Sequence, residues 1–504
     1  MKLVELLEKA RIFDICDVPD IEIGEIVTNS LKADRDSLFV CLEGEKNDGH
    51  RYVREALLRG ARAVVMQSDT KVDMPPYCKN VVFIPTDNTR RAAARLYNAF
   101  YGCPADKLKI IAVTGTNGKS SAVIIMKTIF EAALHRCGII GTVGCSSGEH
   151  RLSANPDSPL ANMTTPDPKE LYRTLAFMAA DGVEYVFMEA SSHALKLGKL
   201  DAIEFDTAIF TNLTPEHLDF HKNMDDYKES KSKLFSMCKT ALINADDPVG
   251  KYMAQKTKGQ VLTYSPKGNM ADFYTERVIL DGGGISYTLV SKNKIMKIKS
   301  SLVGGFNVDN TLAAASCALI HGISTATVGE ALRSITGISG RMERIKLNGE
   351  ESFSVYIDYA HTPDALESLL KSVRAMSGTQ ARIVLLFGCG GDRDKTKRAV
   401  MGRIASEMAD AVIVTSDNCR SEKRESIIDD IMQGFDVRCD HVIIPDRREA
   451  IEYAIKNARR GDVILLAGKG HEKYEIDTDG KHPFDERQIV LDALKKRTER
   501  QGLG

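Results

Sequence analysis

Short apolar runs alternate with helical patterns over the first hundred residues of the chain. Residues 89–100 carry apolar side chains at helical spacing. Three apolar runs before this segment predict strands: 37–42, 63–66 and 81–84. Gly102 and Pro104 then break the pattern, so we place a first domain boundary near residue 107.

The next part of the chain repeats the alternation with more apolar strands. Residues 121–134 have helical periodicity. Around them, four runs predict strands: 109–113, 139–140, 183–188 and 207–210. Largely apolar strands that alternate with helices indicate a parallel sheet covered on both faces. Ligands bind such sheets beyond the carboxyl ends of the strands, so the polar residues that follow each run are candidates for a site.

A second break lies at residues 337–345, where two glycines and a serine precede an arginine pair. Five further runs predict strands after it: 355–358, 383–387, 411–414, 442–444 and 463–467. The chain of 504 residues fits about three domains of ~150 residues. We therefore expect an α/β protein with three domains, at 1–106, 107–338 and 339–504.

The charge balance and the cysteine pattern narrow the class of protein. Lys and Arg number 68 and Asp and Glu 69, which excludes a globally basic nucleic-acid binder but not a local patch. No apolar run approaches the ~20 residues of a membrane span, and the first residues lack an apolar signal core. The 11 cysteines form no CxxC pair. We expect a cytoplasmic protein with reduced thiols and without a nucleic-acid or membrane partner, and the oligomeric state stays open.

The strongest local signal is a phosphate-binding loop at residues 110–121. An apolar strand leads into Gly115, and Gly118, Lys119 and Ser120 open a helix. Glycines allow backbone N–H groups to face a polyphosphate, the lysine neutralises charge and the hydroxyl ligates Mg²⁺. The strict motif has a glycine where this chain has Val113, so the loop is a shorter variant. The alternative is a glycine turn before a helix that happens to carry Lys-Ser.

Acids, histidines and a lysine follow the next strands. Glu189 ends one strand, where a carboxylate commonly holds Mg²⁺. His217 and His221 could share one helical face and bind a metal, although such a pair is more often structural. Zinc would need a third protein ligand that nothing recommends, so we favour Mg²⁺. Lys231 lies in a cationic helical turn. The alternative is that this turn is only a solvated face of the helix.

A dense set of motifs runs in order along the whole chain and resembles the Mur ligase family. Within that family, the chain is most similar to the branch that adds the third residue of the peptidoglycan stem peptide. The motifs are GTNGKSS (115–121), TTPDP (164–168), MEASSHAL (188–195), TNLTPEHLDFH (211–221), YKESKSKLF (227–235), GFNVDN (305–310), GRMERI (340–345), IDYAHTPDALE (357–367), GCGGDRDKTKR (388–398), TSDNCRSE (415–422) and AGKGHE (467–472).

The resemblance implies a fold and a reaction. An N-terminal domain would bind the UDP-sugar, a central ATPase domain would bind ATP and Mg²⁺, and a C-terminal Rossmann-like domain would bind the amino acid. ATP would phosphorylate the γ-carboxyl of D-Glu in a UDP-N-acetylmuramoyl dipeptide. The amine of a diamino acid would attack this acyl phosphate, giving an amide, ADP and phosphate. A lysine and Mg²⁺ would stabilise the transferring phosphoryl group.

The resemblance also implies roles for individual residues. The catalytic positions are Lys119, Glu189, His217 and Lys231. The Mg²⁺ positions are Ser120, Glu189, His217 and Lys231, the last as a carbamate. The ATP positions are Gly115, Thr116, Asn117, Gly118, Lys119, Ser120, Ser121, Asn307, Asn310, Arg341 and Asp358. The positions for the UDP-substrate are Ser30, Thr164, Thr165, Ser191 and Lys199.

The amino-acid pocket bears on the choice of diamino acid. Members that add meso-diaminopimelate carry Asp-Asn-Pro-Arg, whose arginine binds the distal carboxylate as a bidentate fork. This chain keeps the arginine as Arg420 and replaces the proline with Cys419. The resemblance therefore favours diaminopimelate over lysine. The positions that match this pocket are Arg393, Asp417, Asn418, Arg420, Gly468 and Glu472.

The chain departs from the family pattern at four positions, of which Leu197, Lys199 and Met163 lie on the acceptor side. Leu197 and Lys199 stand where the family has glutamine and arginine, Met163 replaces a polar residue, and Ser339 replaces a proline. A paralogue that acts on another amino acid or on a related UDP-sugar peptide is therefore an alternative. A nucleotide-dependent regulator without ligase activity is a second alternative, which the complete set of catalytic positions argues against.

Overall fold

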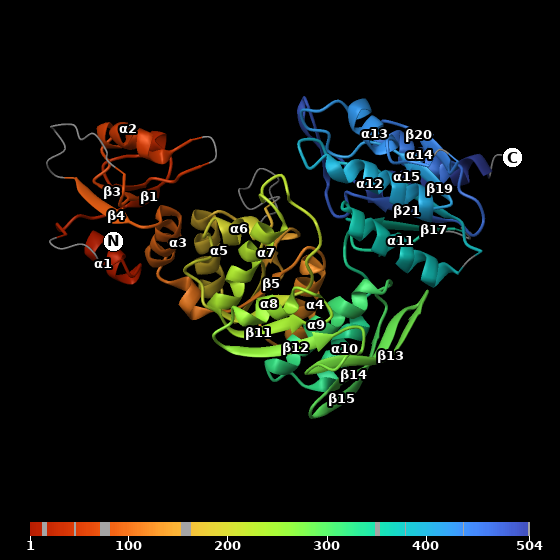
Figure 1. Cartoon of the computed structure of the whole chain (residues 1–504), viewed down its shortest axis with the longest axis horizontal. Helices are drawn as coiled ribbons and strands as arrows, with labels where there is room; N and C mark the ends of the chain where they lie inside the picture. Colours follow the sequence, from red (N-terminus) through yellow and green to blue (C-terminus); the bar gives the residue numbers. More distant parts are fainter. Residues whose placement is uncertain are drawn as a thin grey trace.

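The computed structural model describes residues 1–12, 18–44, 47–70, 81–152, 163–347, 353–378, 380–436 and 438–501. Its strands form three large sheets in which parallel strands alternate with helices, which confirms the expected α/β class. Figure 1 shows the elements around β1–β4 at one end of the molecule and those around β17–β21 at the other. Among the described residues, no helix is both long and apolar enough to cross a membrane.

The first sheet has four parallel strands in the order β1-β2-β3-β4. They are β1 (Glu25–Val27), β2 (Ser37–Val40), β3 (Ala63–Gln67) and β4 (Val82–Thr86). The accompanying helices are α1 (Leu3–Lys9), α2 (Val53–Leu58) and α3 (Thr89–Phe100). Helix α3 occupies the predicted segment, and the Asn88 side chain caps it by accepting from the Arg91 N–H.

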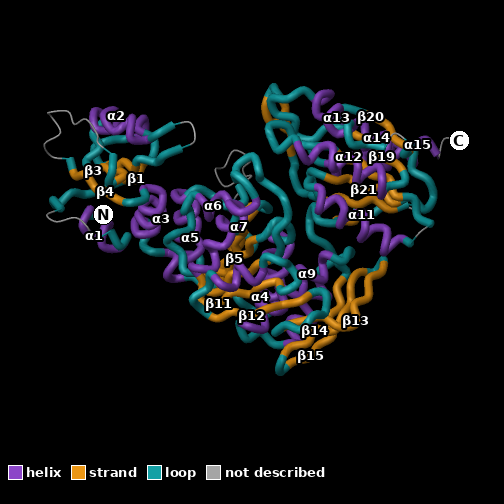
Figure 2. Tube along the Cα trace, in the orientation of Figure 1, coloured by secondary structure: helices purple, strands orange, loops and turns teal. Residues whose placement is uncertain are grey.

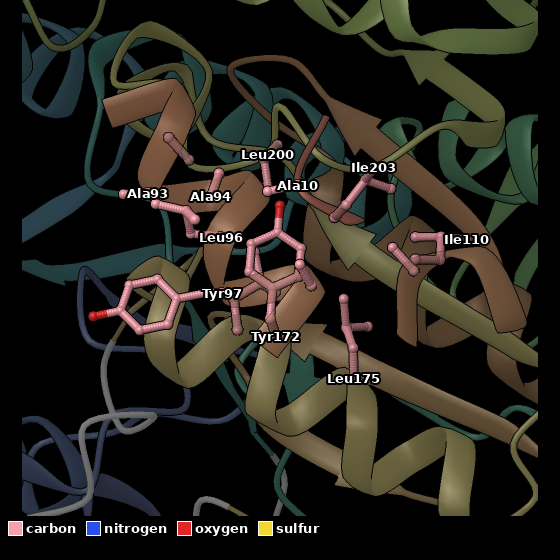
Figure 3. Packing of buried hydrophobic residues seen from close by; sticks show 14 of the residues in the cluster. Ala10, Ala93, Ala94, Leu96, Tyr97, Ile110, Tyr172, Leu175, Leu200 and Ile203 are labelled. Carbon is pink, nitrogen blue, oxygen red and sulfur yellow. The ribbon is translucent and has the colours of Figure 1, made fainter. Parts of the chain in front are cut away.

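A single apolar cluster joins the first sheet to the central part of the chain. Helix α3 packs between α1 and α5 (Pro168–Ala180). Figure 3 shows Leu96 and Tyr97 of α3 close to Tyr172 and Leu175 of α5, with Leu200 nearby. Because this cluster is continuous and buried, the first sheet is held against the central sheet by ordinary core packing.

The central sheet has eleven strands around a parallel core in the order β12-β11-β10-β5-β9-β6. The core strands are β5 (Lys109–Thr114), β6 (Cys137–Gly141), β9 (Tyr185–Glu189), β10 (Phe205–Phe210), β11 (Cys238–Asn244) and β12 (Gln260–Ser265). Three helices cover one face: α4 (Lys119–Ala132), α9 (Phe306–Ile320) and α10 (Thr325–Ser334). Shorter helices lie along the chain between the strands: α6 (Ser192–Lys196), α7 (Met224–Ser232) and α8 (Gly250–Gln255).

Further strands extend both edges of the central sheet, and the sequence patterns did not reveal them. Their pairings are antiparallel, except that the first strand after β12 pairs with β12 in parallel. One edge adds β7 (Gly144–Ser147) and β8 (His150–Arg151), and the other adds β13 (Phe273–Asp281), β14 (Gly284–Ser291) and β15 (Lys294–Ser300). These strands expose one face, so their apolar positions alternate with polar ones and form no continuous apolar run.

The third sheet contains all five strands predicted after residue 345. Its order is β16-β17-β21-β18-β19-β20, and only the short β16 (Glu343–Arg344) is antiparallel. The parallel strands are β17 (Ser354–Asp358), β18 (Ile383–Phe387), β19 (Ala411–Val414), β20 (Asp440–Ile443) and β21 (Val463–Ala467). Two groups of helices cover its faces (Figure 2), and a hairpin follows β21. They are α11 (Pro363–Ser377), α12 (Thr396–Met408) and α13 (Arg424–Met432) on one face, α14 (Arg447–Lys456) and α15 (Glu486–Gln501) on the other, and the hairpin strands β22 (Tyr474–Asp477) and β23 (Gly480–Pro483).

Candidate functional site

The predicted phosphate loop lies between the end of β5 and the start of α4. Its two glycines have positive φ angles, 154° at Gly115 and 88° at Gly118. A Cβ on Gly115 would lie 1.9 Å from Oγ1 of Thr211, and one on Gly118 would lie 2.5 Å from Oδ1 of Asn310. Both positions therefore require glycine, for backbone conformation and for space. This favours a built loop over an incidental glycine turn.

Polar residues that follow β10 brace the loop. The Asn117 N–H donates to Oδ1 of Asn212 over 2.8 Å, and Oγ1 of Thr211 donates to the Asn117 carbonyl over 2.7 Å. Oγ1 of Thr116 donates to the Thr214 carbonyl over 3.1 Å. Thr211 and Asn212 lie at the carboxyl end of β10, a neighbouring parallel strand, where the strand-end rule places ligand-binding residues.

Two lysines converge on the loop from different helices. Nζ of Lys119 donates to the carbonyls of Gly115 and Thr116, each over 2.8 Å, and Nζ of Lys231 donates to the Gly115 carbonyl over 2.7 Å. Burial lowers the pKa of both lysines, and the charge of Lys119 contributes to the large decrease at Lys231. Because Lys231 is 1% exposed, its interpretation as part of a solvated face is wrong.

A buried carboxylate and a hydroxyl lie at the same edge of the sheet. Glu189 ends β9 and accepts hydrogen bonds from the N–H and Oγ1 of Thr142 over 2.8 and 3.2 Å. Ser120 is the second residue of α4, and its Oγ accepts from Nη2 of Arg341 over 3.1 Å. No group of three or more His, Cys, Asp or Glu side chains in the described part of the chain could hold a metal by itself. This donor set fits Mg²⁺, which usually takes one or two carboxylates together with substrate phosphates and water.

The two histidines do not share a helical face, so that hypothesis is wrong. They lie in a turn that follows Pro215, and His217 has a left-handed φ of 58°. His221 is buried, with Nε2 2.9 Å from Oγ of Ser192. Burial, together with the nearby lysine charges, lowers the pKa of His217 to about 4. A neutral imidazole at this position is suited to accept a proton or to ligate a metal.

Side chains from the third sheet's part of the chain reach this edge. Arg341 stacks over the Tyr359 ring at 4.5 Å from the ring centroid, and its buried Nε has no hydrogen-bond partner among the described residues. Oδ2 of Asp364 accepts from Nδ2 of Asn117 over 3.0 Å. Nε2 of His361 lies 3.2 Å from Oε1 of Glu216. An unpaired buried guanidinium N–H beside Ser120 fits an anionic ligand at the phosphate loop.

Other predicted nucleotide residues lie close to these groups. Asn310 donates through Nδ2 to Oδ1 of Asn307 over 3.3 Å, and both side chains are buried. Asp358 ends β17 and accepts from the N–H groups of Met342 and Ala360. Burial raises the pKa of Asp358.

The predicted acceptor residues form one cluster with a single exception. Oγ1 of Thr165 donates to the Glu189 carbonyl over 2.8 Å and lies 3.1 Å from Oγ of Ser191. Oγ1 of Thr164 accepts from Thr142 over 3.1 Å. Nζ of Lys199 forms an ion pair of 2.7 Å with Asp167.

The exception is Ser30, which belongs to the first sheet's part of the chain. Its Oγ donates to Oε2 of Glu55 over 2.8 Å. This hydrogen bond stays within the first sheet's part of the chain.

The six residues predicted for the amino-acid pocket gather beyond the carboxyl ends of β18, β19 and β21. Nδ2 of Asn418 donates to Oε2 of Glu472 over 2.8 Å. A Cβ on Gly468 would lie 2.8 Å from Oδ2 of Asp417. Atoms of Arg420 and the exposed Arg393 both lie within 4 Å of the Cβ position of Gly390. Strands distant in sequence thus bring two cations, two carboxylates and an amide together.

Sequence reasoning missed several polar residues of these clusters. Although burial alone would raise the pKa of Glu216, the hydrogen bond with His361 holds it well below its ordinary value. Thr142 anchors Glu189, and Oη of Tyr359 donates to Glu472 over 3.3 Å. Most of these residues lie beside or inside quoted motifs, and their strand-end positions were the available signal.

Three family models match the chain in succession. The Mur ligase family catalytic domain matches residues 22–101, the Mur ligase middle domain residues 113–318, and the Mur ligase glutamate ligase domain residues 340–470. The chain belongs to the Mur ligase family. The resemblance inferred from the motifs is confirmed.

Similar proteins extend over the full length of this Mur ligase. A UDP-N-acetylmuramoyl-L-alanyl-D-glutamate--2,6-diaminopimelate ligase of Geobacillus thermodenitrificans is 40% identical over 99% of this chain and 100% of its own. The protein of the same name from Caldanaerobacter subterraneus is also 40% identical, over 98% and 99%. A solved structure of a ligase with this name superposes with a TM-score of 0.69 at 31% identity and covers 99% of this chain and all of its own.

A more distant solved structure shows the fold alone. MurF ligase from Thermotoga maritima in complex with ADP is 16% identical, with a TM-score of 0.56 over 96% of this chain and 100% of its own. The three-part Mur ligase architecture is therefore shared well beyond the closely similar sequences.

Proposed function

We propose that this Mur ligase adds meso-2,6-diaminopimelate to the D-Glu γ-carboxyl of UDP-N-acetylmuramoyl-L-alanyl-D-glutamate, with ATP as the energy source. The observation that carries the proposal is the full-length similarity to ligases named for that reaction. The phosphate loop, Lys119 and Arg420 support it. The reaction belongs to the synthesis of peptidoglycan precursors.

The proposal divides the chain into three parts with separate tasks. Residues 1–106 would bind the UDP-sugar with Ser30, residues 107–338 would bind ATP, and residues 339–504 would bind the amino acid. The side chains that join the last two parts, such as Arg341 with Ser120, support a shared site at their boundary. An amide-forming reaction needs this arrangement, because the acyl phosphate and the amine must meet.

The residues at the phosphate loop would perform the phosphoryl transfer. Both the γ-phosphate and the D-Glu carboxylate are anionic, so their approach requires positive charge. Lys119 would leave the carbonyls of Gly115 and Thr116 and donate to the phosphates. Bound Mg²⁺, held by Ser120, Glu189, His217 and Lys231 with the nucleotide, would supply further charge neutralisation. No side chain is needed as a nucleophile.

Lys231 would act as a carbamate. A neutral amine adds CO₂ and releases a proton, which converts the lysine into an anionic oxygen ligand. The burial of Lys231 beside Lys119 supports this, since it lowers the pKa of the amine and favours the neutral form. The Gly115 carbonyl accepts from Nζ, so the group already lies at the phosphate loop.

A second candidate is a paralogue with a different acceptor. Lys199 stands where the family has an arginine, and it forms an ion pair with Asp167. This observation favours the paralogue. Thr164, Thr165 and Ser191 would hold the acceptor in either case.

Measuring phosphate release with each substrate omitted in turn distinguishes the candidates. The proposal predicts release only when ATP, the UDP-dipeptide and diaminopimelate are all present. ATPase activity that does not depend on any UDP-dipeptide would contradict the proposal. Phosphate release with another UDP-sugar peptide would favour the paralogue.

A further inference from the structure

Lys469 follows β21, and its side chain is completely buried. Its Nζ donates to Oδ1 of Asn418 over 2.9 Å and to the carbonyl of Tyr474 over 3.0 Å, and it lies 3.6 Å from Oδ1 of Asp417. A buried ammonium requires such oxygen partners, because without them its desolvation is strongly unfavourable. Lys469 and these oxygens therefore hold one another in fixed positions.

The bond from Lys469 determines how the Asn418 amide is oriented. An ammonium group only donates, so the oxygen of the amide has to face it. The Ile476 N–H donates to the same oxygen over 3.0 Å. The NH₂ group of Asn418 then faces Glu472 and donates to Oε2 over 2.8 Å. A flipped amide would place two oxygens against each other at Glu472.

The charge of Lys469 favours the ionised form of both carboxylates in the pocket, and it outweighs burial at Asp417 but not at Glu472. Burial would raise the pKa of Asp417, but the charges of Lys469 and Arg447 outweigh it and hold that pKa below its ordinary value. Burial and the neighbouring charge of Asp417 raise the pKa of Glu472. The pocket thus contains one firmly ionised carboxylate and one that protonates more easily.

The same lysine connects the β22–β23 hairpin to the loop that carries Arg420. Tyr474 begins the hairpin and accepts from Lys469, while the Ile476 carbonyl accepts from the Arg420 N–H over 3.1 Å. Arg420 has a left-handed φ of 52°, a conformation that its surroundings must stabilise. The hairpin and Lys469 provide part of that support.

We propose that Lys469 is a positioning residue for the incoming diamino acid, acting through Asn418, Glu472 and Arg420 without touching the substrate. The inference rests on the proposed function, since it assigns these residues to the amino-acid pocket. The ammonium group of Lys469 faces the protein. The residues through which it acts are those that would bind the amino and carboxylate groups of the substrate.

The test compares Lys469→Met with Lys473→Met in the full-length protein. The Lys473 side chain is 77% exposed and pairs with Asp485 at 3.3 Å. Lys473→Met is therefore the matched control, which removes a lysine four residues away. For Lys469→Met we expect the KM for diaminopimelate to rise by roughly 10- to 100-fold. The KM values for ATP and the UDP-dipeptide should stay within about twofold, and the control should leave all three unchanged.

Two further variants keep the inference testable. If Lys469→Met does not fold, as judged by its thermal transition, Lys469→Gln retains a donor for Asn418 and should show a smaller rise in the same KM. In combination with Asn418→Ala, the Lys469 substitution should add little to the effect of Asn418→Ala alone.

An unchanged diaminopimelate KM, or an equal rise for all three substrates, overturns the inference. The wild-type protein is measured first, because its diaminopimelate-dependent phosphate release tests the proposed function separately.

Discussion

Arg420 is the residue whose removal should most sharply affect the choice of amino acid. Nη1 of its guanidinium group donates to the carbonyls of Gly391 and Asn418 over 2.7 and 3.2 Å. Among the described residues, its side chain forms no ion pair with a carboxylate. The edge formed by Nε and Nη2 can therefore accommodate the distal carboxylate of diaminopimelate in a bidentate manner.

The expected effect of Arg420→Ala follows from this geometry. Two charge-assisted hydrogen bonds contribute about 1.5–3 kcal/mol each when fully shielded from water. Arg420 is half-buried, so solvent screening reduces the sum to about 2–3 kcal/mol. That corresponds to a roughly 30- to 150-fold weaker affinity. Alanine also carries a Cβ, so the strain of the left-handed backbone at this position is unchanged.

Steady-state kinetics of phosphate release, with each substrate varied in turn, measures this effect. The KM for diaminopimelate should rise by the stated factor while the KM for ATP stays the same. L-Lysine has no distal carboxylate, so the preference of the enzyme for diaminopimelate over lysine should decrease. Arg403→Ala, on the exposed side of α12, is the control and should change neither KM. A diaminopimelate KM within about threefold of wild type would refute the assignment of Arg420.

Two other substitutions test the catalytic cluster and the core of the third sheet. Lys231→Ala should be nearly inactive and partly restored by short carboxylic acids, and full activity without them would remove the carbamate role. Glu486→Gln should destabilise the protein by about 3 kcal/mol, seen in chemical denaturation, because it leaves the buried Arg447 without its charge partner at 2.8 Å. Glu452→Gln, in an exposed pair, should cost less than about 1 kcal/mol, and equal losses would contradict this reasoning.

The sequence located strands best where both faces of the sheet are covered. The runs at 383–387 and 463–467 correspond to β18 and β21, because central parallel strands are apolar at every position. Strands β13 to β15 were missed, since their exposed faces carry charged residues and no continuous apolar run forms. The order of strands in each sheet depends on packing between distant segments and could not be derived from local patterns.

The candidate site was predicted in part for a similar reason. The strand-end rule correctly brought Lys119 and Glu189 to one edge of the sheet, since it depends only on strand direction. The pairing of Glu216 with His361 joins residues 145 positions apart, and no motif states which residue faces which. The expectation of a helical histidine pair also failed, because Pro215 and the left-handed His217 form a turn.

The most direct test of the central claim is to identify the reaction product. The full-length protein is incubated with ATP, Mg²⁺, UDP-N-acetylmuramoyl-L-alanyl-D-glutamate and equal amounts of meso-diaminopimelate and L-lysine. Mass spectrometry then determines which amino acid is attached to the UDP-dipeptide. The account predicts that the diaminopimelate adduct predominates and that ADP and phosphate accompany it in equal amounts. A predominant lysine adduct, or ATP hydrolysis without any adduct, would contradict it.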